Sequence, residues 1–93
     1  PGRRDVRTLE ATLAWIEHRR DEARAILGLL AEVDPGDARP WTALGRTLND
    51  LYRFGEALEF LAEACERDPR DREAWTQRGR SLANTGATAE GLE

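Results

Sequence analysis

Apolar residues recur along the chain at intervals of three and four, a spacing that places side chains on one face of a helix. In the middle of the chain one such stripe consists of Trp41, Leu44, Leu48 and Leu51. After a break at Gly55 a second stripe follows, made of Ala57, Leu58, Leu61, Ala64 and Cys65. Two amphipathic helices joined by a short turn are therefore expected, over residues 38–51 and 54–67.

The flanking segments predict further helices of the same kind. A stripe of Val6, Leu9, Leu13 and Ile16 predicts a helix over 5–18. Other helices are expected over 21–33 and 72–84, with the beginning of another from residue 88. Pro69 disfavours the helical conformation at the residue before it and ends the fourth helix, while Asp37 and Asp71 are placed to cap the helices that follow them. The predicted fold class is all-α.

The sequence repeats itself with a period of 34 residues. The segment WTALGRTL, beginning at Trp41, returns as WTQRGRSL, beginning at Trp75. Residues 38–59 and 72–93 are identical at eight of 22 positions without a gap. A period of this length is typical of proteins built by stacking one small helical unit on the next.

Each tryptophan-containing helix also holds a glycine, Gly45 or Gly79, one turn further along. A glycine inside a helix costs about 1 kcal/mol relative to alanine. We expect these glycines to allow a neighbouring helix to approach closely, with Ala23 and Ala57 as the small residues of the facing helices.

This pattern resembles the tetratricopeptide repeat, a 34-residue helix pair that follows W-x₂-L-G-x₂-Y…A-x₃-F…P. Residues 38–71 form the complete repeat, with leucine in place of both aromatic residues: Trp41, Leu44, Gly45, Leu48, Ala57, Leu61 and Pro69. Residues 72–93 form a partial repeat, which keeps the tryptophan and the glycine but has Arg78 and Gly91 where leucine and alanine are expected.

Residues 4–37 form a degenerate first repeat. Its second helix fits the pattern through Ala23, Leu27 and Pro35. Its first helix lacks the spaced Trp–Gly signature of the other two repeats. Its apolar stripe aligns with that of the next repeat at an offset of 35. This offset predicts one extra residue in the turn near His18–Asp21.

The resemblance implies stacked antiparallel helix hairpins in a right-handed α-solenoid, here a single domain over residues 1–93. It also implies a protein-interaction module whose first helices line a concave groove. The residues expected to face this groove are Trp15, Thr42, Arg46, Asn49, Asp50, Thr76, Gln77, Arg80 and Asn84.

The chemistry of these residues suggests a peptide ligand. Guanidinium groups hold carboxylates by paired hydrogen bonds, and Asn and Gln can satisfy an extended peptide backbone. One hypothesis places an acidic group of the ligand near Arg46 and Arg80, and an apolar side chain near Trp15. In the alternative, both arginines pair locally, Arg46 with Asp50 and Arg80 with Glu73 or a neighbouring carboxylate.

A structural role is the competing function. The terminal helices expose apolar stripes that lack a full neighbour, so the chain could form a homodimer or serve as a spacer in a larger protein, which could itself be an enzyme. The chain begins at Pro1 and contains no methionine, and it is expected to be part of a longer protein.

The composition of the chain argues against several other classes of function. The net charge of −4 argues against nucleic acid as a partner, and no apolar run approaches the roughly 20 residues of a membrane span. One cysteine and one histidine leave no metal site of the usual kind, and no cofactor is expected. A nucleophile would have to come from Ser81 or Cys65 with His18, on separate helices, so no enzyme activity is expected. The free cysteine and the absence of a signal peptide favour the cytoplasm.

Overall fold

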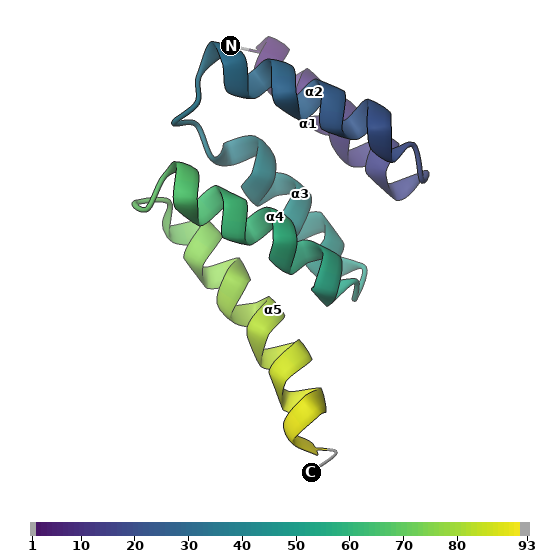
Figure 1. Cartoon of the computed structure of the whole chain (residues 1–93), viewed down its shortest axis with the longest axis vertical. Coiled ribbons are helices and arrows are strands. Elements are labelled where there is room, and N and C mark those ends of the chain that lie inside the picture. The colour runs from purple at the N-terminus through teal and green to yellow at the C-terminus, as the bar shows by residue number, and fades with distance from the viewer. Residues whose placement is uncertain (1, 92–93) are drawn as a thin grey trace.

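The computed structural model describes residues 2–91, with side chains described for residues 3–85. This part of the chain contains five helices and no strand: α1 (Gly2–Ile16), α2 (Arg20–Val33), α3 (Arg39–Asp50), α4 (Phe54–Arg67) and α5 (Arg72–Gly91). Figure 1 shows two antiparallel hairpins, α1–α2 and α3–α4, followed by α5. The predicted all-α fold of stacked hairpins is confirmed.

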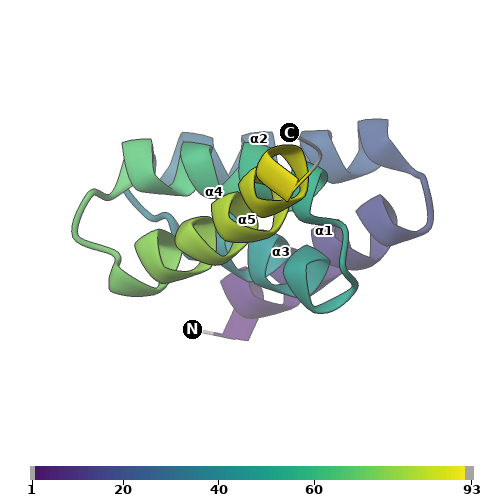
Figure 2. The ribbon, with the colours of Figure 1, turned by 90° about the horizontal axis from the view of Figure 1, so that it is seen from below.

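The helices lie in two layers. Seen from below, α2 and α4 form one layer, while α1 and α3 form the other (Figure 2). Helix α3 packs against α1 on one side and α5 on the other, and α5 also packs along α4. The first helices of successive repeats are therefore neighbours, as a stacked repeat protein requires.

The two turns inside the hairpins are the same turn, repeated 34 residues apart. His18 and Tyr52 both have a positive φ, 66° and 62°. In each turn the following amide donates back to the helix: Arg19 N to Ala14 O and Arg53 N to Leu48 O, both at 2.8 Å. The offset of 35 and the extra residue expected near His18–Asp21 are wrong, because the first repeat keeps the 34-residue period.

This register reverses the face of α1 that was expected to be buried. Ala11, Ala14 and Trp15 are buried, whereas Val6 and Leu13, with Leu9 of the same predicted stripe, are exposed. At an offset of 34, Ala11 corresponds to Gly45, the position where helices come closest. A periodic stripe shows that a helix is amphipathic, but it does not identify the partner when two faces carry apolar residues.

The centre of the core is the α3–α4 hairpin. Leu44, Leu48 and Leu61 are fully buried, and Cys65 is buried beside them, as expected. A Cβ atom added at Gly45 would lie 2.4 Å from Cγ of Leu61, so the predicted role of this glycine in close helix packing is confirmed. Leu51, which ends the predicted stripe, is instead exposed at the end of the helix.

Helix α5 departs from the prediction at its C-terminal end. It is continuous from Arg72 to Gly91, so the expected end at 84 and the second helix from 88 are wrong for the described residues. Continuing a helix adds one hydrogen bond per residue, whereas a new helix requires costly nucleation. No heavy atom lies within 4 Å of a Cβ added at Gly79, so close packing there is not found.

The two predicted caps behave differently. Asp71 caps α5, because its Oδ1 accepts from Ala74 N at 3.0 Å. Asp37 accepts from Arg39 N at 3.1 Å, and α3 begins only at Arg39. Asp37 thus bonds the first amide of α3, whereas Asp71 bonds the third amide of α5.

Candidate functional site

A cleft of about 270 Å³ crosses the layer of first helices. It receives side chains from both hairpins and from the start of α5, and we call it the groove cleft: Asp5, Thr8, Arg39, Thr42, Ala43, Arg46, Asp71 and Glu73. Two of the residues predicted to face the groove, Thr42 and Arg46, line it. Its charged groups are of both signs, which suits a polar ligand.

Two ion pairs join α3 to α5 along this layer. Arg46 Nη1 lies 2.9 Å from Glu73 Oε1, and Arg80 Nη1 lies 2.8 Å from Asp50 Oδ1. The arginines do pair locally, but with the partners exchanged relative to the expected pairs, because each guanidinium reaches across to the neighbouring helix. The side chains of Arg46 and Glu73 are 47% and 49% exposed, and exposed pairs contribute only about 0–1 kcal/mol.

Asn49 is fully buried between the same two helices. Its Nδ2 donates to both the main-chain oxygen and Oε1 of Gln77 at 3.0 Å, and its Oδ1 accepts from Ser81 Oγ at 2.7 Å. Every hydrogen-bonding group of the amide is used within the protein. Asn49 and Gln77 therefore fix the spacing of α3 and α5, and Asn49 has no group left for a ligand.

Thr42 has a similar structural contact. It is buried, and its Oγ1 donates to Asp71 Oδ2 at 2.9 Å. One repeat earlier, Arg4 Nε donates to Asp37 Oδ2 at 3.0 Å. In both repeats, a first helix thus holds the aspartate that precedes the next first helix.

The carboxylate of Asp37 lies between two guanidinium groups. Arg39 Nε lies 2.8 Å from Oδ1, and Arg4 approaches the other oxygen. These contacts lower the pKa of Asp37 to about 2. The largest cause is the hydrogen bond from the Arg39 side chain, and the Arg39 amide and Arg4 lower the pKa further. This carboxylate stays charged at any physiological pH.

Trp15 does not offer the apolar surface expected of it. Only 2% of the residue is exposed. Its indole nitrogen donates to Glu56 Oε1 at 3.1 Å, and its ring meets Phe60 edge to face at 4.7 Å between centroids. Arg53, then Trp15 and Arg20, lower the pKa of Glu56. With α1 in the 34-residue register, Trp15 takes the place of the buried Asn49 and packs between the repeats.

The remaining predicted groove residues lie on α5. Thr76 is exposed. Asn84 is exposed as well, and its Nδ2 donates to Arg80 O at 2.8 Å. Of the predicted residues, the accessible ones with polar groups are thus Arg46, Asp50, Thr76, Arg80 and Asn84. Sequence reasoning missed Arg39 and Glu73 as cleft residues, although they are related by the 34-residue period.

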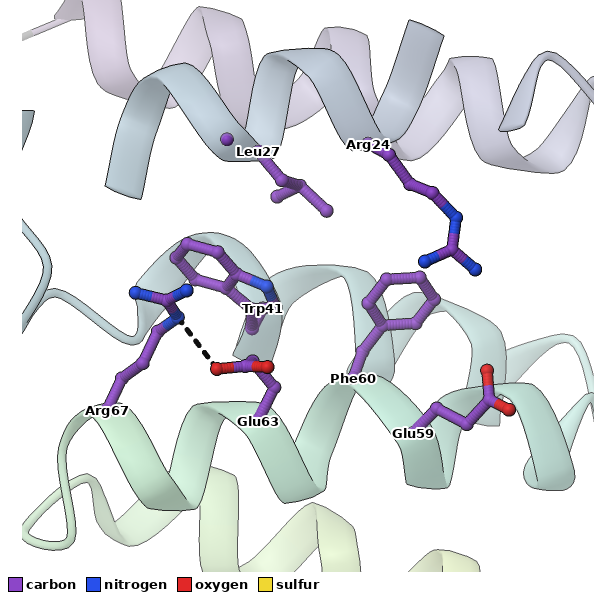
Figure 3. A pocket seen from close by; sticks show the side chains of 8 residues that line it. Arg24, Leu27, Trp41, Glu59, Phe60, Glu63 and Arg67 are labelled. Carbon is purple, nitrogen blue, oxygen red and sulfur yellow. Dashed lines mark ion pairs between the residues drawn. The ribbon is translucent and has the colours of Figure 1, made fainter. Parts of the chain in front are cut away.

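A second cleft, of about 300 Å³, lies in the other layer between α2 and α4. No Cα of α2 lies within 8 Å of a described Cα of α4, and side chains from both helices line the cleft between them. Figure 3 shows Trp41 and Phe60 beside one another, with Arg24 extending from α2 toward Phe60. The Arg67 guanidinium lies 4.0 Å from the centroid of Trp41 and pairs with Glu63 at 3.1 Å. Arg67 thus shields the tryptophan from solvent.

The groups considered for catalysis do not form a site. Ser81 is buried and donates to Asn49, and Cys65 is also buried, while His18 lies in the exposed α1–α2 turn. Within the described residues, no cluster of three or more His, Cys, Asp or Glu side chains could hold a metal ion. The helices described here include none with the length and hydropathy needed to span a bilayer.

Stacked hairpins with a polar cleft across their first helices define an all-α repeat protein of the interaction type. Residues 39–81 match the tetratricopeptide repeat family, and the five described helices form a fold of the tetratricopeptide-like repeat kind. No curated protein and no solved structure gives a significant match. The family match indicates a protein-interaction repeat module.

Proposed function

We propose that the chain binds a short extended segment of another protein in the groove cleft and has no catalytic activity of its own. The observation that carries the proposal is the cleft itself, which spans α1, α3 and α5. A ligand lying across three successive first helices contacts every repeat at once. The cleft volume of about 270 Å³ suits one or two side chains of such a segment, with the rest of it lying along the surface.

Arg46 is the group that a ligand carboxylate would meet. Its side chain is about half exposed, and among the described residues its one ion-pair partner is Glu73. Since an exposed pair contributes about 0–1 kcal/mol, a ligand carboxylate can replace Glu73 at small cost and bond the guanidinium through two parallel hydrogen bonds. Arg80, Thr76 and Asp50 extend the polar surface along α3 and α5 for the remainder of the segment.

The buried contacts beside the cleft support a preformed site. Asn49, Gln77 and Ser81 join α3 to α5, and Thr42 bonds Asp71. Because these bonds fix the helix spacing before a ligand arrives, binding orders few groups of the protein and keeps more of the interaction energy as affinity.

Substitution of Arg46 tests this function. The probe is a fluorescein-labelled library of extended peptides, each with one Asp or Glu, matched to the same peptides with Asn or Gln. Arg46→Ala should weaken the binding of selected acidic peptides about tenfold, equivalent to about 1.4 kcal/mol, as measured by fluorescence anisotropy. The matched control is Arg70→Ala, which removes the same charge from the exposed α4–α5 turn.

The outcome depends on keeping the fold constant. Both variants should retain the helical circular dichroism of the wild type, because neither side chain is buried. Equal binding by the wild type and Arg46→Ala, or equal binding of the acidic and the amide peptides, would rule out an acid-recognising groove at this position.

A further inference from the structure

The first hairpin exposes a continuous apolar face on the side of α1 and α2 that points away from α3 and α4. Its apolar members are 48% or more exposed, except for Ile26 at the bottom of the seam between the helices: Val6, Leu13, Ile26, Leu29 and Val33. Two clefts run along this seam, of about 400 and 170 Å³. We call this surface the terminal face.

Charge is divided between the two ends of the terminal face. The larger cleft is bordered by Arg3, Arg4 and Arg7. The smaller one is bordered by Glu10 and Glu22, together with Arg19, which pairs with Glu22 and also with Glu17. One end is therefore basic and the other, on balance, acidic.

Two guanidinium groups at the basic end are available to pair with carboxylates of another molecule. Arg4 is occupied by Asp37, but Arg3 forms no ion pair with any side chain that the structure describes. Arg7 has only a long, exposed contact with Glu10 at 3.5 Å. Exposed apolar surface bordered by charged groups marks a docking surface rather than ordinary solvent-facing helix.

The next repeat shows what covers such a face. The corresponding side of the α3–α4 hairpin lies against the first hairpin, where Phe60 of α4 meets Trp15 edge to face. Phe60 is related to Ile26 by the 34-residue period. The terminal face is thus the surface on which a helix hairpin of the same kind fits.

We propose that the terminal face binds a second copy of this chain about a two-fold axis, with the two α1–α2 hairpins antiparallel. A two-fold axis brings the same surface of both copies together, so the surface must be complementary to itself. Antiparallel packing satisfies this condition, because it places the basic end of each copy on the acidic end of the other. It sets Arg7 against Glu10, and Arg3 against Glu22, between copies.

The apolar residues match in the same arrangement. Leu13 lies toward the acidic end of α1, whereas Leu29 and Val33 lie toward the basic end of the seam. Antiparallel packing therefore places Leu13 of one copy on Leu29 and Val33 of the other. These exposed side chains leave water only in the dimer, which provides the driving force.

The test is sedimentation velocity of the whole chain over the micromolar range, in which a specific interface of about 1,000 Å² or more is expected to associate. The wild type should show a concentration-dependent dimer. Leu13→Glu should raise the dimer Kd at least about tenfold. Leu82→Glu is the control, because it adds the same charge on an equally exposed leucine of α5.

Charge exchange tests the antiparallel arrangement. Arg3→Glu/Arg7→Glu and Glu10→Arg/Glu22→Arg should each be monomeric, whereas an equimolar mixture should form a heterodimer. A wild type that stays monomeric, a dimer lost through Leu82→Glu but not Leu13→Glu, or a mixture that stays monomeric would each overturn the proposal. The terminal face shares no residue with the groove cleft, so this result and peptide binding can fail independently.

Discussion

Helices α3 and α5 carry the same Trp–Gly–Leu stripe in opposite surroundings. Trp41 is 5% exposed and Leu48 is fully buried, whereas Trp75 and Leu82 are each 48% exposed. The cause is α4, which packs on the stripe of α3 and places Leu61 against Gly45. No described helix packs on the equivalent stripe of α5. The same residues therefore stabilise one repeat and leave the other with an exposed apolar face. The reason is that a repeat protein gains its folding energy largely from the interfaces between neighbouring elements.

The largest effect that this comparison predicts concerns the two tryptophans. Trp41→Ala should lower the free energy of unfolding by about 3–5 kcal/mol, because it removes a buried ring at the centre of the core. Trp75→Ala should cost about 1 kcal/mol or less, since the residue is already 48% exposed and its indole nitrogen donates one bond, to Pro69 O. Urea unfolding followed by circular dichroism measures both.

The magnitude for Trp41 is a large share of the stability of a small domain. If Trp41→Ala does not fold, Trp41→Leu provides a milder truncation for comparison with Trp75→Leu. Equal losses for the two positions would mean that the α5 stripe is covered in solution, and the contrast between the helices would be wrong.

The two glycines should respond with opposite sign. Gly45→Ala should destabilise the protein by about 1–3 kcal/mol, because its Cβ would overlap the buried side chain of Leu61. Gly79→Ala should stabilise it by up to about 1 kcal/mol, because alanine is the better helix former and meets open space.

These changes are measured as shifts in the urea midpoint at constant slope. The pair contains its own control, because both substitutions add one methyl group to a helix. A loss of stability in Gly79→Ala would show that a helix approaches α5 there, and would restore the close packing expected from the sequence.

The same contrast explains which parts of the structure the sequence could predict. The 34-residue period and the stripe of α3 and α4 led correctly to stacked hairpins, because there the helix pattern and its partner are both within the chain. For α1 the pattern was misleading, since the stripe through Val6 and Leu13 is apolar but faces away from α3, on the exposed side of the first hairpin. Periodicity locates an apolar face without identifying what covers it.

The candidate site shows a similar limit. Arg46 could be placed on the first-helix layer, because its position on the stripe is fixed by the period. Its partner could not be predicted, because Glu73 belongs to the next helix and its reach depends on the spacing of α3 and α5. Asn49 was expected at the surface, but it is buried beneath α5, where Gln77 and Ser81 satisfy its amide. The sequence of α3 alone does not show how α5 packs.

The smallest predicted effect on stability comes from a comparison of the two aspartates that precede α3 and α5. Each aspartate accepts a bond from a backbone amide, but Asp71 is also bonded by the hydroxyl of Thr42, whereas Asp37 is also bonded by two guanidinium groups. The pKa of Asp37 is lowered to about 2, mainly by Arg39, while an unfolded aspartate titrates near 4. The charged form therefore stabilises the fold above about pH 4. That contribution is lost as the pH falls from about 4 toward 2, because the unfolded chain takes up the proton first.

Asp37→Asn removes this contribution, so it should destabilise the protein at pH 6 and have a much smaller effect near pH 2. The difference at pH 6 should be about 1 kcal/mol or less, because Arg39 is largely exposed and water screens the pair. Urea unfolding at several pH values between 6 and 2 measures it, with Asp34→Asn, at an exposed position in the same turn, as the control. Arg39→Ala should flatten the pH dependence in the same way, since it removes the main cause of the lowered pKa. A difference between wild type and Asp37→Asn that stays constant over this range would show that the two arginines do not hold the charged carboxylate, and the first repeat would then resemble the second at this turn.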